Sequence, residues 1–136
     1  MAEKADRRRL DDFHARCLRI ILKIPAAYYS RVSNASVLRS AERASASTLL
    51  LRRQLVHLGK VLRSSPGTVL RDVSFIGDTT APATTRYIRK VGRPRLEWIP
   101  CVLSEVFCIT GGSSTNLNEL VKCPAGWKSF VNRSIT

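Results

Sequence analysis

The chain has 136 residues and carries 23 Lys and Arg against 10 Asp and Glu, a formal net charge of +13. Its length predicts one domain with a core of its own, no apolar run is long enough for a membrane span, and the N-terminus lacks the apolar region of a signal peptide. We therefore expect an intracellular protein, located in the nucleus and without a membrane partner. A net charge of this size favours a polyanionic partner, with nucleic acid preferred over an anionic membrane surface.

The first predicted element is a helix over residues 5–24, ended by Pro25. Its apolar face is formed by residues at helical spacing, namely Leu10, Phe13, His14, Cys17, Leu18, Ile21 and Ile24. Arg9, Arg16 and Lys23, spaced seven residues apart, form a basic row with Arg19 beside it. We expect the apolar face to enter the core and the basic row to face solvent.

Two further helices follow in the first half of the chain. Ser33 is a candidate N-cap for a short helix that carries Val37, Leu38 and Ala41. A longer helix over residues 47–63 places on its apolar face Leu51, Leu55, Leu58 and Leu62. The cations of this helix lie mostly off that face, and residues 64–67 (SSPG) end it as a turn.

The second half is less regular. The β-branched stretch over 68–76 is compatible with one short strand, for which the sequence offers no partner. Residues 95–109 predict a helix that either kinks at Pro100 or begins there, and two short helices follow, around Leu117–Val121 and Trp127–Val131. The predicted fold is mainly α, with four to six helices and at most one short β element. Its segments are 1–64 (helical), 65–94 (a basic extended connector) and 95–136 (helical), within one domain.

The connector ends in a strongly basic stretch, RYIRKVGRPRLEW, over residues 86–98. Five cations fall within ten residues that contain no acid, and Gly92 and Pro94 disfavour a helix interior. Fixed positive charge on an extended backbone suits a polyanion track. Arg93, between Gly92 and Pro94, either enters a narrow minor groove or belongs to a plain linker.

No constellation for catalysis is visible in the sequence. The acids form no metal-binding cluster by spacing, and phosphate-loop and nucleophile-elbow motifs are absent. His14 lies on the predicted apolar face, where a core histidine is the simplest interpretation, and a Cys17–His14 nucleophile lacks a third group. The four cysteines form no C-x-x-C motif and are interpreted as reduced thiols. We expect no enzymatic activity, no metal and no cofactor.

Five blocks of the chain carry a family resemblance, namely LDDFHARCLRIILKI (Leu10–Ile24), RVSNASVLRSA (Arg31–Ala41), LLLRRQLVHLGKVLRS (Leu49–Ser64), RKVGRPRLEW (Arg89–Trp98) and GWKSFV (Gly126–Val131). In this order they resemble the region that follows the polymerase in non-LTR (LINE-type) retrotransposon reverse transcriptases. His57 and Lys60 stand where that family tends to carry Trp and His, and Pro100 interrupts the helix after the G-R-P block. The polymerase motif [FY]-x-D-D is absent from the chain.

The resemblance implies a helical, template-handling appendage whose partners are RNA or DNA and the polymerase portion of the parent protein. We expect phosphate contacts from ten cations: Arg16, Arg19, Lys23, Arg52, Arg53, Arg86, Arg89, Lys90, Arg93 and Arg95. A free-standing helix-turn-helix-like DNA-binding protein, built on residues 33–42 and 47–63, is the alternative. A membrane-surface protein fits less well, because the cations spread along the chain.

Overall fold

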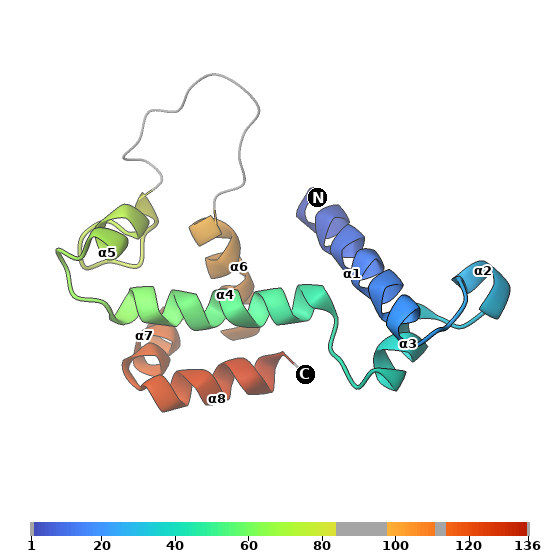
Figure 1. Cartoon of the computed structure of the whole chain (residues 1–136). Coiled ribbons are helices and arrows are strands. Elements are labelled where there is room, and N and C mark those ends of the chain that lie inside the picture. Colours follow the sequence, from blue (N-terminus) through green and yellow to red (C-terminus); the bar gives the residue numbers. More distant parts are fainter. Residues whose placement is uncertain (1, 84–97, 111–113, 136) are drawn as a thin grey trace, which may run out of the picture. The chain divides into compact units, whose positions relative to one another are not determined.

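A computed structural model describes residues 2–83, 98–110 and 114–135, and within those ranges the protein is mainly α-helical, as predicted (Figure 1). The described helices are α1 (Ala2–Ile21), α2 (Ala27–Ser30), α3 (Asn34–Ser40), α4 (Ala46–Arg63), α5 (Val69–Ser74), α6 (Trp98–Thr110), α7 (Ser114–Lys122) and α8 (Pro124–Ser134). These eight helices exceed the predicted four to six, because short helices also form at 27–30, where no element was predicted, and at 69–74, which was predicted as a strand.

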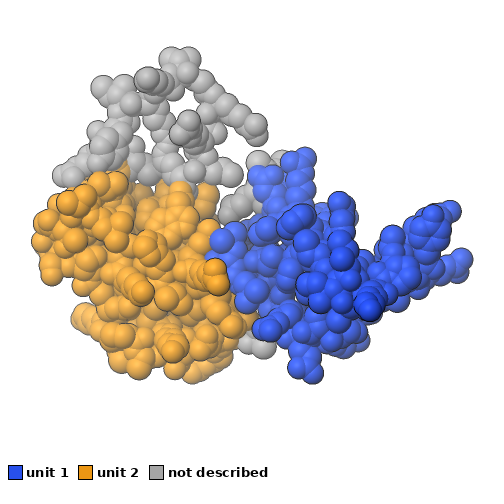
Figure 2. Space-filling view, in the orientation of Figure 1, with its two compact units in different colours: residues 1–51 blue, residues 52–136 orange. Residues whose placement is uncertain are grey.

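The chain forms two compact units, residues 1–51 and residues 52–136, which are coloured separately in Figure 2. The division falls inside α4, between Leu51 and Arg52. The sequence grouped the whole of α4 with the N-terminal helices, whereas its residues from Arg52 onward belong to the second unit. The reason is that the buried side chains of α4 are Leu55, Leu58 and Val61, all of which lie beyond the division.

In unit 1, polar contacts join α1 to the starts of two other helices. The Asp11 carboxylate accepts hydrogen bonds from the backbone N–H (2.8 Å) and the hydroxyl (2.6 Å) of Ser47, so it caps the N-terminus of α4. Asp12 accepts a 3.3 Å hydrogen bond from the Asn34 amide at the start of α3. Ser33 caps α3 through the Ser36 N–H at 3.1 Å, which confirms the predicted capped helix.

The buried face of α1 matches the predicted one only in part, because Leu10, His14, Cys17 and Leu18 of the predicted face are half-buried. Ala15 and Arg19 are buried, whereas Phe13 is 62% and Ile21 72% exposed. Asp11, Ala15 and Arg19, four residues apart, therefore form the inward face of this helix. Hydropathy alone missed Arg19 and wrongly included Phe13 and Ile21. The reason is that polar contacts of Asp11 and Arg19 to other segments of unit 1 set the rotation of the helix.

The ends of α1 and α3 share an unusual turn. Lys23 and Glu42 both adopt the left-handed conformation, with φ of 55° and 51°. In each case the next residue donates back across the helix end, from Ile24 N to Arg19 O at 2.9 Å and from Arg43 N to Leu38 O at 3.0 Å. These are Schellman motifs in which Lys and Glu occupy the position usually taken by glycine. Helix α1 thus ends before Pro25, at Ile21.

The core of unit 2 is built around Trp127 on α8, packed against α4. Leu55 and Leu58 are fully buried, as the leucine stripe predicted, while Leu51 and Leu62 are half-buried. The Trp127 indole N–H donates to Leu55 O at 2.9 Å. A Cβ placed on Gly59 would lie 2.2 Å from Trp127 Nε1, so glycine is required where the indole crosses α4. Val102, Val106, Leu117 and Val131 complete the core from α6, α7 and α8.

The predicted strand over 68–76 is wrong, because Val69–Ser74 forms helix α5. The β-branched residues Val69 and Val73 are exposed, so their strand preference brings no packing advantage. Helical geometry instead lets Arg71 and Phe75 be buried side by side, with the guanidinium 5.0 Å from the ring centroid. The β pairing found in the described residues is a single antiparallel bridge, between Phe75 and Pro82.

The C-terminal helices agree with the prediction. Helix α6 is described over Trp98–Thr110 and contains Pro100 as its third described residue. The first predicted residues of this helix, 95–97, lie outside the described residues. Helices α7 and α8 bury Leu117, Val121, Trp127 and Val131, which are residues that the sequence placed on two short helices.

Candidate nucleic-acid interface

Some of the cations expected to bind nucleic acid are exposed in the structure, and others form hydrogen bonds within the fold. On α1, Arg16 is exposed, and Lys23 is exposed in the turn after it, as the basic row with Arg9 predicted. Arg9 itself forms a 3.7 Å ion pair with Asp6 one turn earlier. Because both partners are exposed, that pair holds the arginine weakly. Arg16 and Lys23 are therefore exposed cations of unit 1.

Arg19 has a different role from the predicted one. Its side chain is only 6% exposed, and its guanidinium donates hydrogen bonds to Pro25 O (3.1 Å), Ser30 Oγ (3.4 Å), Asn34 Oδ1 (3.2 Å) and, at a short distance, Val32 O. A fork of five N–H donors suits this set of converging oxygens. Arg19 thus fastens the 25–34 segment to α1, and we remove it from the candidate phosphate contacts.

Three arginines of unit 2 are also used internally, each on a carbonyl at the C-terminal end of a helix. Arg52 donates to Ile135 O after α8 at 3.3 Å, Arg63 to Val121 O in α7 at 3.2 Å, and Arg71 to Leu62 O in α4 at 2.8 Å. The last carbonyls of a helix lack intrahelical donors and carry its negative dipole end, so a cation there is stabilising. Arg52, one of the expected phosphate contacts, is therefore half-buried and hydrogen-bonded within unit 2.

Arg53, the neighbour of Arg52, is exposed on α4, as are His57 and Lys60. These residues follow one another at helical spacing, and they form a basic face of unit 2. The His57 ring lies against Trp98 at the start of α6, with ring centroids 5.3 Å apart. This contact joins the basic face of α4 to the start of the described part of α6.

The five remaining expected contacts, Arg86, Arg89, Lys90, Arg93 and Arg95, lie outside the described residues. Sequence reasoning also left out several cations that the structure exposes, namely Arg8, Arg31, Arg39, Arg43, Lys122 and Lys128. In unit 1 the sequence itself indicated these further cations, because between Asp12 and Glu42 the chain contains five cations and no acid. This part of the chain therefore contains no acidic side chain that would offset its positive charge.

Exposed apolar side chains share the surface of unit 1 with these cations. On α1, Phe13, Ile20 and Ile21 are largely exposed. On α2, Tyr28 and Tyr29 are 88% and 80% exposed. The tyrosine pair was not among the predicted site residues. Two aromatic residues just after Pro25, on a segment too short for a core helix, were a signal for it.

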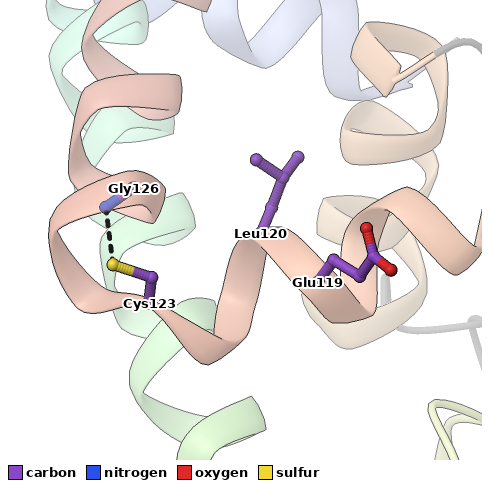
Figure 3. Close-up of a pocket in the computed structure, with 4 residues that line it drawn as sticks. All are labelled: Glu119, Leu120, Cys123 and Gly126. Atoms are coloured by element: carbon purple, nitrogen blue, oxygen red, sulfur yellow. Dashed lines mark hydrogen bonds between the residues drawn. The ribbon is translucent and has the colours of Figure 1, made fainter.

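Figure 3 shows a pocket of about 390 Å³ at the junction of α7 and α8, lined by Glu119, Leu120, Cys123 and Gly126. The Cys123 sulfur accepts a 3.4 Å hydrogen bond from the Gly126 N–H and so caps α8. Within the part of the chain that the structure describes, no group of three His, Cys, Asp or Glu could hold a metal ion. Cys17, Cys101, Cys108 and Cys123 form no disulfide.

Comparisons of the chain with protein-family models, with curated proteins and with solved structures find no match. Among the described residues, no helix is both long enough and apolar enough to cross a membrane.

Proposed function

We propose that this chain is a non-catalytic post-polymerase segment of a non-LTR (LINE-type) retrotransposon reverse transcriptase, and that it binds RNA or DNA mainly through phosphate contacts. The observation that carries the proposal is the surplus of cations that the fold leaves exposed. Arg19, Arg52, Arg63 and Arg71 donate to carbonyl oxygens within their own units. Four other cations, Arg16, Lys23, Arg53 and Lys60, still face solvent. Such charges bind a phosphate backbone by releasing its counterions.

The exposed apolar face of α1 supports the view that the chain belongs to a larger protein. Phe13, Ile20 and Ile21 would be costly to leave in water on an independent domain. In a reverse transcriptase, the polymerase portion would cover them, and it is the protein partner that we propose. The five sequence blocks in order support the same parent.

The free-standing helix-turn-helix alternative is less well supported. A recognition helix reads bases with polar side chains near its N-terminus. On α4 these positions include the exposed Leu49 and Leu50, while Ser47 is bound to Asp11 and Thr48 to Ser45. We therefore keep phosphate contact as the binding mode.

A salt titration tests the proposal, using the purified chain with labelled duplex DNA, a structured RNA and anionic liposomes. Affinity for the nucleic acids should fall linearly with salt in a log–log plot, and Arg53→Gln should lower the slope by about one. The adjacent Arg52→Gln is the matched control, and it should leave the slope unchanged because Arg52 is bound to Ile135 O. Binding to liposomes alone would contradict the proposal.

Primer extension with magnesium or manganese tests the second half of the proposal. We expect no nucleotide incorporation, because the chain contains no polymerase carboxylate motif. Template-dependent incorporation that is abolished by a substitution in this chain would overturn the non-catalytic assignment.

A further inference from the structure

Tyr28 and Tyr29 form an aromatic pair that the fold of unit 1 does not use. They lie on α2, a single turn with no buried residue, and are 88% and 80% exposed. Their rings meet edge to face, with centroids 5.3 Å apart and planes at 86°. Aromatic side chains are normally buried to a large extent, so a pair exposed to this degree indicates a contact surface.

The segment that carries the two tyrosines is fastened at both ends. Arg19 donates to Pro25 O before α2 and to Val32 O after it. Ser30 adds hydrogen bonds to Pro25 O at 3.1 Å and Ala26 O at 3.2 Å, and it accepts one from Val32 N at 3.3 Å. A segment ordered in advance loses little entropy when a ligand binds to it. The buried Arg19 thus positions α2 by bonding the chain on both sides of it.

The charge around the pair is positive. Lys23 precedes α2 and Arg31 follows it, both are exposed, and both adopt the left-handed conformation, with φ of 55° and 53°. No acid occurs between Asp12 and Glu42. A ligand that matches this surface would have a flat ring to stack on the tyrosines and a negative charge to meet the cations. A single helical turn offers no amphipathic helix for insertion into a membrane surface.

We propose that Tyr28 and Tyr29 form a stacking platform for unpaired bases of single-stranded RNA or DNA, with Lys23 and Arg31 on the flanking phosphates. Aromatic rings beside a basic track are the usual means of binding single strands without sequence preference. Bases inside a duplex are stacked on one another and do not reach such a platform. The inference deepens the proposed function, because it assigns the single-stranded form of nucleic acid to one place in unit 1.

The test compares the full chain with the double variant Tyr28→Ala/Tyr29→Ala, on a labelled single strand of about 20 nucleotides and on the duplex of the same sequence. The variant should bind the single strand about tenfold more weakly and keep its salt slope, because no charge is removed. Affinity for the duplex should not change. Tyr28→Phe/Tyr29→Phe, which retains both rings, should bind the single strand nearly as well as the wild type.

The outcomes separate this inference from the proposed function. If wild type binds with the expected salt slope and the alanine variant loses nothing, or loses equally on both probes, the platform is wrong and phosphate binding stands. If wild type binds neither probe, the proposed function fails and the platform fails with it. Loss of liposome binding, with single-strand binding retained, would assign the tyrosines to a membrane and overturn the inference. Because α2 buries nothing, an unchanged urea midpoint should show that the variant is folded.

Discussion

At the residue scale, arginines of this chain differ in their roles: some are exposed to solvent and others donate to carbonyl oxygens inside the fold. Arg16 and Arg53 face solvent, whereas Arg19, Arg52, Arg63 and Arg71 donate to carbonyl oxygens within their own unit. A guanidinium can serve several carbonyls at once through its fork of donors, which an ammonium cannot. Part of the large positive charge of this chain therefore stabilises the fold.

Replacing Arg19 tests this division. Arg19→Lys keeps the charge but cannot reach Pro25 O and Val32 O together, so it should lower the free energy of unfolding by about 1–3 kcal/mol. Arg16→Lys, on the exposed side of the same helix, should change it by less than about 0.5 kcal/mol. Urea unfolding followed by circular dichroism measures both. Equal effects of the two substitutions would contradict the internal role of Arg19.

Gly59 gives a second test at this scale. Gly59→Ala places a Cβ 2.2 Å from Trp127 Nε1, so it should destabilise by about 1–3 kcal/mol, although alanine is normally the better helix former. Gly126→Ala is the matched control, because its Cβ would meet Cys123 Cβ at an ordinary 3.5 Å. That variant should be neutral or more stable by up to about 1 kcal/mol. A stabilising Gly59→Ala would mean that the indole does not cross α4 there.

At the element scale, each helix of this protein combines a local sequence preference with a constraint from its neighbours. The capped start of α3, the leucine stripe of α4 and the start of α8 at Cys123 and Pro124 follow from local rules. The rotation of α1 and the helical state of 69–74 do not. Both depend on where a buried arginine finds its acceptors, in the 25–34 segment for Arg19 and at Leu62 O for Arg71.

The leucine stripe of α4 makes a prediction for this helix. Leu58→Ala removes a fully buried side chain and should cost about 2–5 kcal/mol. Leu50→Ala, on the same helix but substantially exposed, should cost less than about 1 kcal/mol. Thermal or urea unfolding distinguishes them. Similar costs at the two positions would show that the stripe does not face the core.

The Schellman turn after α3 leads to a second stability prediction for an element. Glu42 holds a left-handed φ of 51°, which costs a residue with a Cβ about 1 kcal/mol relative to glycine. Glu42→Gly should therefore raise the free energy of unfolding by about 0.5–1 kcal/mol. The same change at Glu119, exposed inside α7, should lower it by about 1 kcal/mol. Two changes of the same sign would contradict the assigned turn.

At the scale of the whole molecule, we expect salt to change the stability of this chain, whose net charge is +13, and the proposed binding to nucleic acid in opposite directions. Unit 1 carries ten Lys and Arg against five acids, and unit 2 carries 13 against five, so both repel themselves. Screening by salt relieves this repulsion. The same screening weakens the attraction to a phosphate backbone.

Raising KCl from about 50 to about 500 mM should therefore increase the urea midpoint of the free protein while it decreases affinity for RNA and DNA. Unfolding curves and fluorescence anisotropy on one protein preparation measure the two responses. A urea midpoint that falls with salt would mean that attractive ion pairs, and not repulsion, dominate the electrostatics of the folded state.

The sequence by itself determined the helical class, the capped α3, the buried Leu55 and Leu58 and the positive charge. These properties depend on residues a few positions apart or on composition, and a periodic pattern records them directly. Only the tertiary structure decided that Arg19 and Arg52 turn inward, that α1 shows Phe13 to solvent, and that Thr68–Ile76 contains a helix and no strand. The physical reason is that a guanidinium is buried only where carbonyls converge on it, and those carbonyls come from other segments of the fold: Val32 O for Arg19 and Ile135 O for Arg52.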